Sequence, residues 1–272
     1  NDLFRQERIR AEKDIEILKT LRLKPVKALV AEARFAYVFE EWARGLQLAD
    51  QALRENPAFA DTLVVRASIK RELAMRQMPI DKPRLVEALA DCDAAINYEV
   101  NNAEAYRVRA ELALALGRYE DAVRDLAEME SIAPDEPQTY NDKAMVLEQD
   151  PVASRSADEI GRVIQRALDL DPQNATARFR RAARTLDSVS RDGPKEKFRR
   201  ARADLDVALR SDPAFTMARV YRMVCDLGLD DDVALEEDLD AFLRTLPPGE
   251  PQQMERVRNG VKGLVHFLRQ SS

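Results

Sequence analysis

Apolar residues between positions 103 and 134 recur at helical spacing in two consecutive stretches. In the first stretch, Tyr106 and Ala110 stand four positions apart, and Gly117 follows the last apolar residue. The apolar positions that share one face of the second stretch are Ala122, Leu126 and Met129. Pro134 ends the second stretch, since proline cannot continue a helix. The pattern therefore predicts two short helices, each with one apolar stripe that has to be buried against neighbouring helices.

The same unit recurs along the chain, and prolines mark its end. Each of these prolines stands five positions after an alanine or a large apolar residue, at Pro57, Pro134, Pro172, Pro213 and Pro247, and Val100 takes the place in the second unit. The steps between successive markers are 43, 34, 38, 41 and 34 residues. The excess over 34 falls in segments 78–83, 149–156 and 189–194, between the two helices of a unit. Extra length there costs little, because the entropy of loop closure grows slowly with loop length.

These spacings resemble those of tetratricopeptide repeat (TPR) proteins, whose repeat of 34 residues is a helix, a turn and a second helix. The six expected repeats are 26–59, 60–102, 103–136, 137–174, 175–215 and 216–249. The small residue that the family places in the middle of the first helix is matched by Ala33, Ala67, Ala110, Ala144 and Ala182, and Met223 departs from it. The second-helix pair of small and apolar positions is matched by Gly45/Ala52, Ala88/Ala95, Ala122/Met129, Ile160/Ala167 and Ala201/Ala208, with Leu235/Phe242 as the bulkiest and least similar pair.

The resemblance implies an all-α, right-handed α-solenoid of about six helix pairs. We expect a flanking helix within residues 1–25 and a capping helix within residues 250–272. The apolar residues that share one side of this last segment are Met254, Val257, Val261, Leu264, Val265 and Leu268. In solenoids, such a terminal helix covers the apolar face that the last repeat would otherwise expose. The expected total is about fourteen helices and no strand.

Composition is that of an ordinary globular chain, with 45% hydrophobic and 34% charged residues and only 8 glycines. The net charge of −6 argues mildly against nucleic acid as the main partner. No apolar run approaches the length of about 18 residues that a membrane span needs. The sequence shows no signal peptide, but it begins at Asn1 without a methionine, so this absence says little about the compartment. A cytoplasmic location is favoured, with an exported or membrane-tethered fragment as the alternative.

The sequence offers poor material for catalysis. The single histidine, His266, leaves no histidine pair for a metal, and there is no glycine-rich phosphate loop or nucleophile elbow. Cys92 and Cys225 lie far apart within apolar helical patterns, which indicates two buried thiols. Residues 230–232 are three aspartates without the spacing of a calcium loop. We therefore expect neither enzymatic activity nor a cofactor.

Basic and acidic residues recur at fixed positions of the repeats. The basic residues of the first helices are Arg66, Arg109, Lys143, Arg181 and Arg222, and the aspartates of the second helices are Asp91, Asp125, Asp204 and Asp238. Antiparallel helices bring each arginine near an aspartate of its own or an adjacent repeat, where a bidentate pair fixes the helix register. We interpret this arginine–aspartate ladder as structural rather than as a phosphate site. The fourth repeat is expected to lack the pair, because Lys143 stands opposite Val163.

In TPR proteins, the inner wall of the solenoid is formed by the first helix of each repeat and binds the partner. The residues at the inward positions are Arg34, Tyr37, Val64, Ser68, Arg71, Arg107, Glu111, Asn141, Met145, Phe179, Ala183, Val220 and Val224. This mixture suits an extended peptide or a helix of a partner protein, with Arg107 and Asn141 gripping polar groups and Phe179 as an apolar hot spot. The carboxylate clamp that binds chaperone tails is not rebuilt, and Glu111 would repel a terminal carboxylate. The open alternative is that the apolar residues of the last two repeats pack on the terminal helix instead, namely Phe179, Ala183, Val220 and Val224.

Two further functions remain as alternatives to a protein-interaction scaffold. Segment 178–202 holds ten basic and three acidic residues, which would suit a solenoid that binds nucleic acid. Segment 226–255 holds ten acidic residues against Arg244 alone, so the two segments could instead face each other within the protein. The second alternative is a structural or oligomerisation arm whose groove is filled by its own ends.

Overall fold

The protein is described by a computed structural model that covers residues 8–10, 12–13, 16, 25–150, 157–187, 189 and 193–245. Over these residues the elements are helices and none is a strand, as the sequence predicted. The helices are α2 (Pro25–Val38), α3 (Trp42–Glu55), α4 (Ala60–Met75), α5 (Lys82–Tyr98), α6 (Ala103–Ala115), α7 (Tyr119–Ile132), α8 (Pro137–Gln149), α9 (Ala157–Leu170), α10 (Ala175–Asp187), α11 (Lys195–Ser211), α12 (Thr216–Leu229) and α13 (Asp232–Thr245). The expected capping helix in residues 250–272, and most of the expected flanking helix in residues 1–25, lie outside the described residues.

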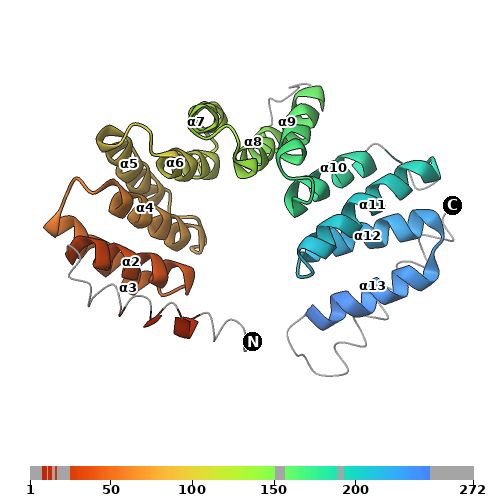
Figure 1. Ribbon diagram of the computed structural model, residues 1–272, viewed down its shortest axis with the longest axis horizontal. Coiled ribbons are helices and arrows are strands. Elements are labelled where there is room, and N and C mark those ends of the chain that lie inside the picture. Colours follow the sequence, from red (N-terminus) through yellow and green to blue (C-terminus); the bar gives the residue numbers. More distant parts are fainter. Residues whose placement is uncertain are drawn as a thin grey trace. The chain divides into compact units, whose positions relative to one another are not determined.

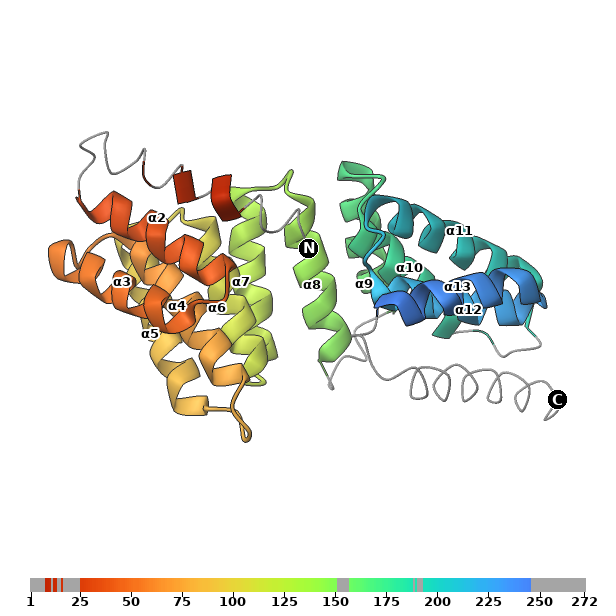
Figure 2. The same cartoon turned by 90° about the horizontal axis from the view of Figure 1, so that it is seen from below.

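The chain divides into two compact units, residues 1–153 and residues 154–272. We refer to the even-numbered helices as A helices and to the odd-numbered helices as B helices. Within unit 1, each A helix of the first three pairs packs on the B helix that follows it, and α8 packs on α7 (Figures 1 and 2). Unit 2 contains α9 and the pairs α10–α11 and α12–α13. The repeat boundaries given above remain a prediction.

The connections that lead from a B helix to the next A helix all have the same length. Segments 56–59, 99–102, 133–136, 171–174 and 212–215 are each four residues long. Asparagine or aspartate side chains order several of these turns. Asn56, Asp171 and Asp212 each accept a hydrogen bond from the backbone N–H two residues later. Asn102 and Asn174 accept from the N–H three residues later, at the start of α6 and α10.

The proline markers take part in the same turns through their carbonyl groups. The Tyr140 hydroxyl donates to the Pro134 carbonyl over 2.8 Å. In the two repeats that follow, arginine takes the place of this tyrosine. Arg178 donates to the Pro172 carbonyl and Arg219 to the Pro213 carbonyl, over 2.8 and 2.9 Å. Each donor stands six residues after its proline, so these bonds fix how an A helix leaves the preceding turn.

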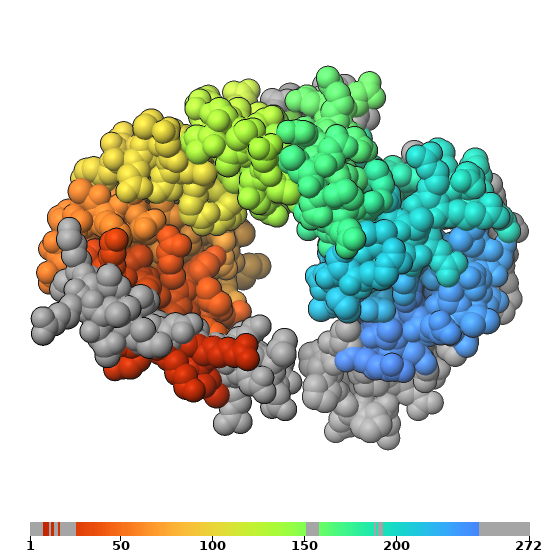
Figure 3. Space-filling model, viewed as in Figure 1, coloured from red at the N-terminus to blue at the C-terminus, as the bar shows by residue number. Residues whose placement is uncertain are grey.

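Small residues bring the helices close together. The five alanines that match the middle of the A helix are buried, as the resemblance predicted. Gly45 of α3 lies so near its neighbours that an added Cβ would come within 2.8 Å of the Ile69 side chain. Gly117 has a φ of 74° and follows the end of α6, which confirms its predicted role as a helix stop. Side chains fill the spaces between the paired helices within each unit (Figure 3). Within the described part of the chain, no helix has the length and apolarity that a membrane span requires.

Candidate functional site

The arginines of the predicted ladder each hold an aspartate of the B helix in the same pair. Arg66 and Asp91 form two parallel hydrogen bonds of 3.0 and 2.6 Å, and Arg109 and Asp125 form two of 2.9 and 2.6 Å. In unit 2, Arg181 pairs with Asp204 in the same bidentate way, and Arg222 pairs with Asp238. The planar guanidinium matches a carboxylate in this geometry, and the charge on both groups strengthens the bonds.

A second contact, which the sequence reasoning missed, joins each of these arginines to the B helix before its own pair. Nη1 of Arg66, Arg109 and Arg222 contacts Asp50, Asp93 and Asp206, at 3.0, 2.7 and 2.9 Å. Nη1 of Arg181 donates to Gln165 in the corresponding position over 3.3 Å. All four partners stand 16 residues before their arginine, which is the signal that would have found them. One guanidinium thus connects two neighbouring B helices.

The aspartates of these pairs are largely buried, so each needs its arginine to compensate its charge. The side chains of Asp91, Asp125 and Asp238 are at most 8% exposed. Hydrogen bonds to the aspartates raise the pKa of Arg109 and Arg222, although partial burial opposes this. The arrangement therefore neutralises buried charge and leaves no bidentate donor face for an external phosphate.

Lys143 replaces the arginine in the fourth A helix. Its Nζ lies 2.8 Å from Glu130 of α7, in unit 1. From the sequence, only Val163 was expected opposite Lys143, and this contact with Glu130 of the preceding helix was not predicted.

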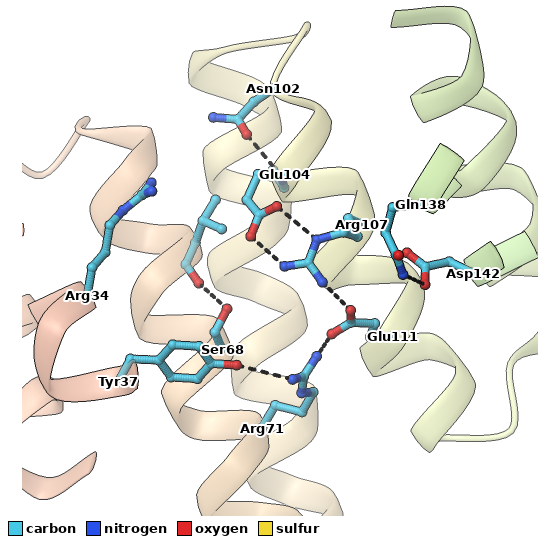
Figure 4. A network of polar contacts seen from close by, with 12 residues as sticks. Arg34, Tyr37, Ser68, Arg71, Asn102, Glu104, Arg107, Glu111, Gln138 and Asp142 are labelled. Carbon is cyan, nitrogen blue, oxygen red and sulfur yellow. Dashed lines mark hydrogen bonds and ion pairs between the residues drawn. The ribbon is translucent and has the colours of Figure 1, made fainter. Parts of the chain in front are cut away.

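A second polar network lies on the A helices of unit 1 (Figure 4). Arg71 of α4 donates to the Tyr37 hydroxyl over 3.4 Å and pairs with Glu111 of α6. Arg107 pairs with the same Glu111 through Nη1, while its Nε and Nη2 donate to Glu104 over 2.8 and 2.5 Å. Hydrogen bonds and ion pairs thus join three consecutive A helices. We call the surface formed by α2, α4, α6 and α8 the A-helix face of unit 1.

The geometry corrects three expectations for this face. Val64 and Asn141 are each only 2% exposed, so they lie within the packing rather than on a surface open to a partner. All three guanidinium nitrogens of Arg107 already bind carboxylates of its own helix, so this side chain is not free to grip a peptide. Glu111 lies between Arg71 and Arg107, which compensate its negative charge. The expectation that Glu111 would repel a terminal carboxylate left out these two arginines.

Of the remaining predicted residues of unit 1, Ser68 is also buried, and the others are at least partly exposed. Arg34 reaches Asp61 of α4 over 3.2 Å, and about half of each side chain is accessible, 52% and 49%. Ser68 is 6% exposed and donates to the Val64 carbonyl, so its hydroxyl serves its own helix. Met145 of α8 is partly buried. On the same helix, Gln138 donates to Asp142 over 2.7 Å.

The predicted residues of unit 2 form an apolar set. The Phe179 ring lies 5.0 Å from Phe215 and 5.1 Å from Tyr221, centre to centre, so it packs against the start and the middle of α12. Ala183 and Val220 are partly buried, and Val224 is 46% exposed. Phe179 belongs to unit 2, whereas Arg107, Asn141 and Met145 belong to unit 1. These contacts favour a packing role for Phe179.

Much of the basic segment 178–202 is paired within unit 2. Arg178 and Arg181 share Asp204, and two hydrogen-bonding arginines lower the pKa of this aspartate although burial alone would raise it. Lys195 lies 2.9 Å from Asp230, and Arg202 contacts Asp226 and Asp231 at 3.1 and 2.9 Å. The basic and acidic segments thus meet within this unit, which was one of the two readings of the sequence. Among the described residues, no group of three or more potential ligands could hold a metal ion.

Comparison with known proteins identifies the architecture through structure alone. No protein-family profile and no curated protein matches the sequence. A thermophilic TPR protein of Thermus thermophilus superposes with a TM-score of 0.58 at 19% identity, over 74% of this chain and 99% of that one. The chain has the TPR fold. Pseudomonas aeruginosa PilF gives a TM-score of 0.64 at 13% identity, over 85% of this chain and 96% of that one. Human IFIT1, solved with m7Gppp-AAAA, gives 0.60 at 14% identity, over 86% of this chain and 55% of that one.

Proposed function

We propose that this TPR chain is a non-catalytic scaffold that binds a peptide or a helix of a partner protein through the A-helix face of unit 1. The observation that carries the proposal is the polar network across α2, α4 and α6, which holds charged side chains in fixed places on a partly exposed surface. Fixed polar groups lower the entropy cost of binding, because fewer side chains have to be ordered by the partner.

Three accessible charged groups of this face are Arg34, Asp61 and Glu104, with side chains 52%, 49% and 48% exposed. They stand on three consecutive A helices, so a partner that lies across the helices meets all three. Arg71, Arg107 and Glu111 are less exposed and hold one another in place. In this proposal, the outer three recognise the partner and the inner three position the surface.

Selection from a displayed peptide library tests the proposal. Peptides selected on the wild-type chain should lose binding to the variant Arg34→Glu/Glu104→Lys, because both substitutions reverse accessible charges of the A-helix face. The matched control is Arg124→Glu on α7, whose side chain is 69% exposed and lies on a B helix. Peptides that bind the face variant as well as the control would contradict the proposal, as would a selection that yields no binder.

Nucleic-acid binding is less well supported. The solved IFIT1 structure contains a capped oligonucleotide, but its likeness to this chain is one of fold. Four basic residues of the segment that would serve this purpose are bound to aspartates: Arg178, Arg181, Lys195 and Arg202. A binding affinity for single-stranded RNA that falls steeply with salt would reverse this preference.

A further inference from the structure

The connection between α4 and α5 exposes apolar side chains to an unusual degree. All six residues of segment 75–80 are exposed. Met78 is 92% exposed, and Met75 and Ile80 are 43% and 37% exposed. Figure 2 shows this connection extending beyond the neighbouring helices of unit 1, at the bottom of the view. An exposed apolar group of this kind marks a surface that contacts another molecule or a membrane.

The charges around this tip are mostly positive. Arg76 and Lys82 are exposed, and segments 75–80 and 82–83 contain no carboxylate. The one acidic residue of the connection, Asp81, is turned toward α5, where its side chain accepts a hydrogen bond from the Arg84 N–H over 3.1 Å. Arg76 also pairs with the exposed carboxylate of Glu40 at 3.5 Å. Segment 75–83 thus holds two basic residues and one acidic residue beside its exposed apolar side chains, a net charge of +1 in a chain whose net charge is −6.

The tip is also firmly attached at its base. The Arg76 guanidinium lies 3.8 Å from the centre of the Trp42 ring, a cation–π contact between the end of α4 and the start of α3. The backbone N–H groups of Gln77 and Asp81 both donate to the Ala74 carbonyl. Pro79 and Pro83 have no N–H to desolvate, which lowers the cost of moving this segment out of water.

We propose that segment 75–82 inserts its apolar tip into the interface of an anionic lipid membrane. Met78 and Ile80 would enter the boundary between headgroups and acyl chains, while Arg76 and Lys82 remain with the lipid phosphates. Exposed side chains of a short protruding connection fit a fluid interface better than a second protein. A stable protein complex buries roughly 800 Å² on each partner from about 20–30 residues, far more than this connection presents.

Sedimentation with vesicles tests the proposal on the full chain. The wild type should bind vesicles of equimolar phosphatidylcholine and phosphatidylserine, and should bind pure phosphatidylcholine vesicles markedly less. The variant Met78→Ser/Ile80→Ser should lower the partition coefficient roughly tenfold, because two apolar side chains no longer leave water. Lys82→Glu should weaken binding to the anionic vesicles only. The matched control is Met217→Ser/Val233→Ser in unit 2, where these residues are 49% and 71% exposed.

A fluorescent label reports the insertion directly. Both native cysteines are buried, and burial raises the pKa of both thiols, that of Cys225 to about 12, so they react slowly. An environment-sensitive dye on Met78→Cys is therefore attached selectively, and its emission should shift to the blue on addition of anionic vesicles. The same dye on Met217→Cys should not respond.

Three results would overturn the proposal. The first is a wild-type chain that does not sediment with anionic vesicles. The second is equal binding by the tip variant and the unit 2 control. The third is a wild-type dimer in light scattering that becomes a monomer in the tip variant, which would make the tip a protein interface instead. Circular dichroism melting of each variant checks that loss of binding is not loss of fold.

Discussion

Replacing Arg109 by alanine tests whether the ladder holds the repeats together. The substitution removes two hydrogen bonds to Asp125 and one contact with Asp93. Asp125 is 5% exposed, so its carboxylate loses its partner in a place that water reaches poorly, whereas Asp93 is 57% exposed and regains water. A fully buried orphaned charge costs about 3–5 kcal/mol, and the Arg109 side chain, 25% exposed, leaves a channel for water. We therefore expect a loss of about 2–3 kcal/mol in the free energy of unfolding.

Urea unfolding followed by circular dichroism measures this loss. The matched control is Arg124→Ala on α7, an exposed arginine that lies 3.2 Å from Asp121 and should cost less than about 0.5 kcal/mol. In the double variant Arg109→Ala/Asp125→Ala, the carboxylate is gone as well, so the double change should cost clearly less than the sum of the single changes. If Arg109→Ala is as stable as the control, or if the two changes are additive, the ladder does not stabilise the stacked repeats as proposed.

Three further predictions concern unit 2. Burial raises the pKa of Asp226 from an ordinary 3.8 to about 6, so between these values the folded state holds a proton that the unfolded state releases, and the protein loses stability as pH rises from 4 to 6. Asparagine at this position does not titrate. The stability of Asp226→Asn minus that of the wild type should therefore be up to about 3 kcal/mol larger at pH 7 than at pH 4, as measured by urea unfolding at both values. Gly228→Ala places a Cβ 2.5 Å from the buried Phe198 ring and should destabilise the protein by about 1–3 kcal/mol. Gly161→Ala, whose Cβ would have no neighbour within 4 Å, should stabilise it by about 0.5–1 kcal/mol, and melting curves that rank the two variants the other way would contradict the packing argument. Phe179→Ala should lower the free energy of unfolding by about 2–3 kcal/mol, because its aromatic contacts are lost, and should leave peptide binding by unit 1 unchanged. If the folded variant no longer binds peptide, Phe179 belongs to the binding surface after all.

The helices and their order could be predicted from the sequence because small residues and prolines carry strong local constraints. Ala67 or Ala110 leaves room for a neighbouring helix, and Pro134 or Pro172 ends one, whatever the rest of the chain does. The bidentate partner of Arg109 was also predictable, since it lies in the same repeat. The contact with Asp93 was missed because it depends on the stacking of one repeat on the next.

The candidate site was harder to predict, because position on an inward face does not decide what a side chain contacts. Arg107 has Glu104 three residues before it and Glu111 four residues after it, a spacing at which charged side chains on one helix meet. That signal was in the sequence, and it outweighs the assignment of Arg107 to a ligand. Val64 and Asn141 face inward by count, yet the side-by-side packing of the A helices buries them.

The constant turn from each B helix to the next A helix bears on how such a chain can be enlarged. This turn has four residues, and its proline carbonyl accepts a hydrogen bond from a side chain six residues later. One inserted residue would move that donor away from the carbonyl, so the turn has no room for an insertion. The turns within a pair differ in length from the two residues 230–231 to the seven residues 188–194. An epitope tag or a whole guest domain should therefore be accepted after Leu116 and rejected after Pro134, so new sequence can accumulate at only one edge of the repeats.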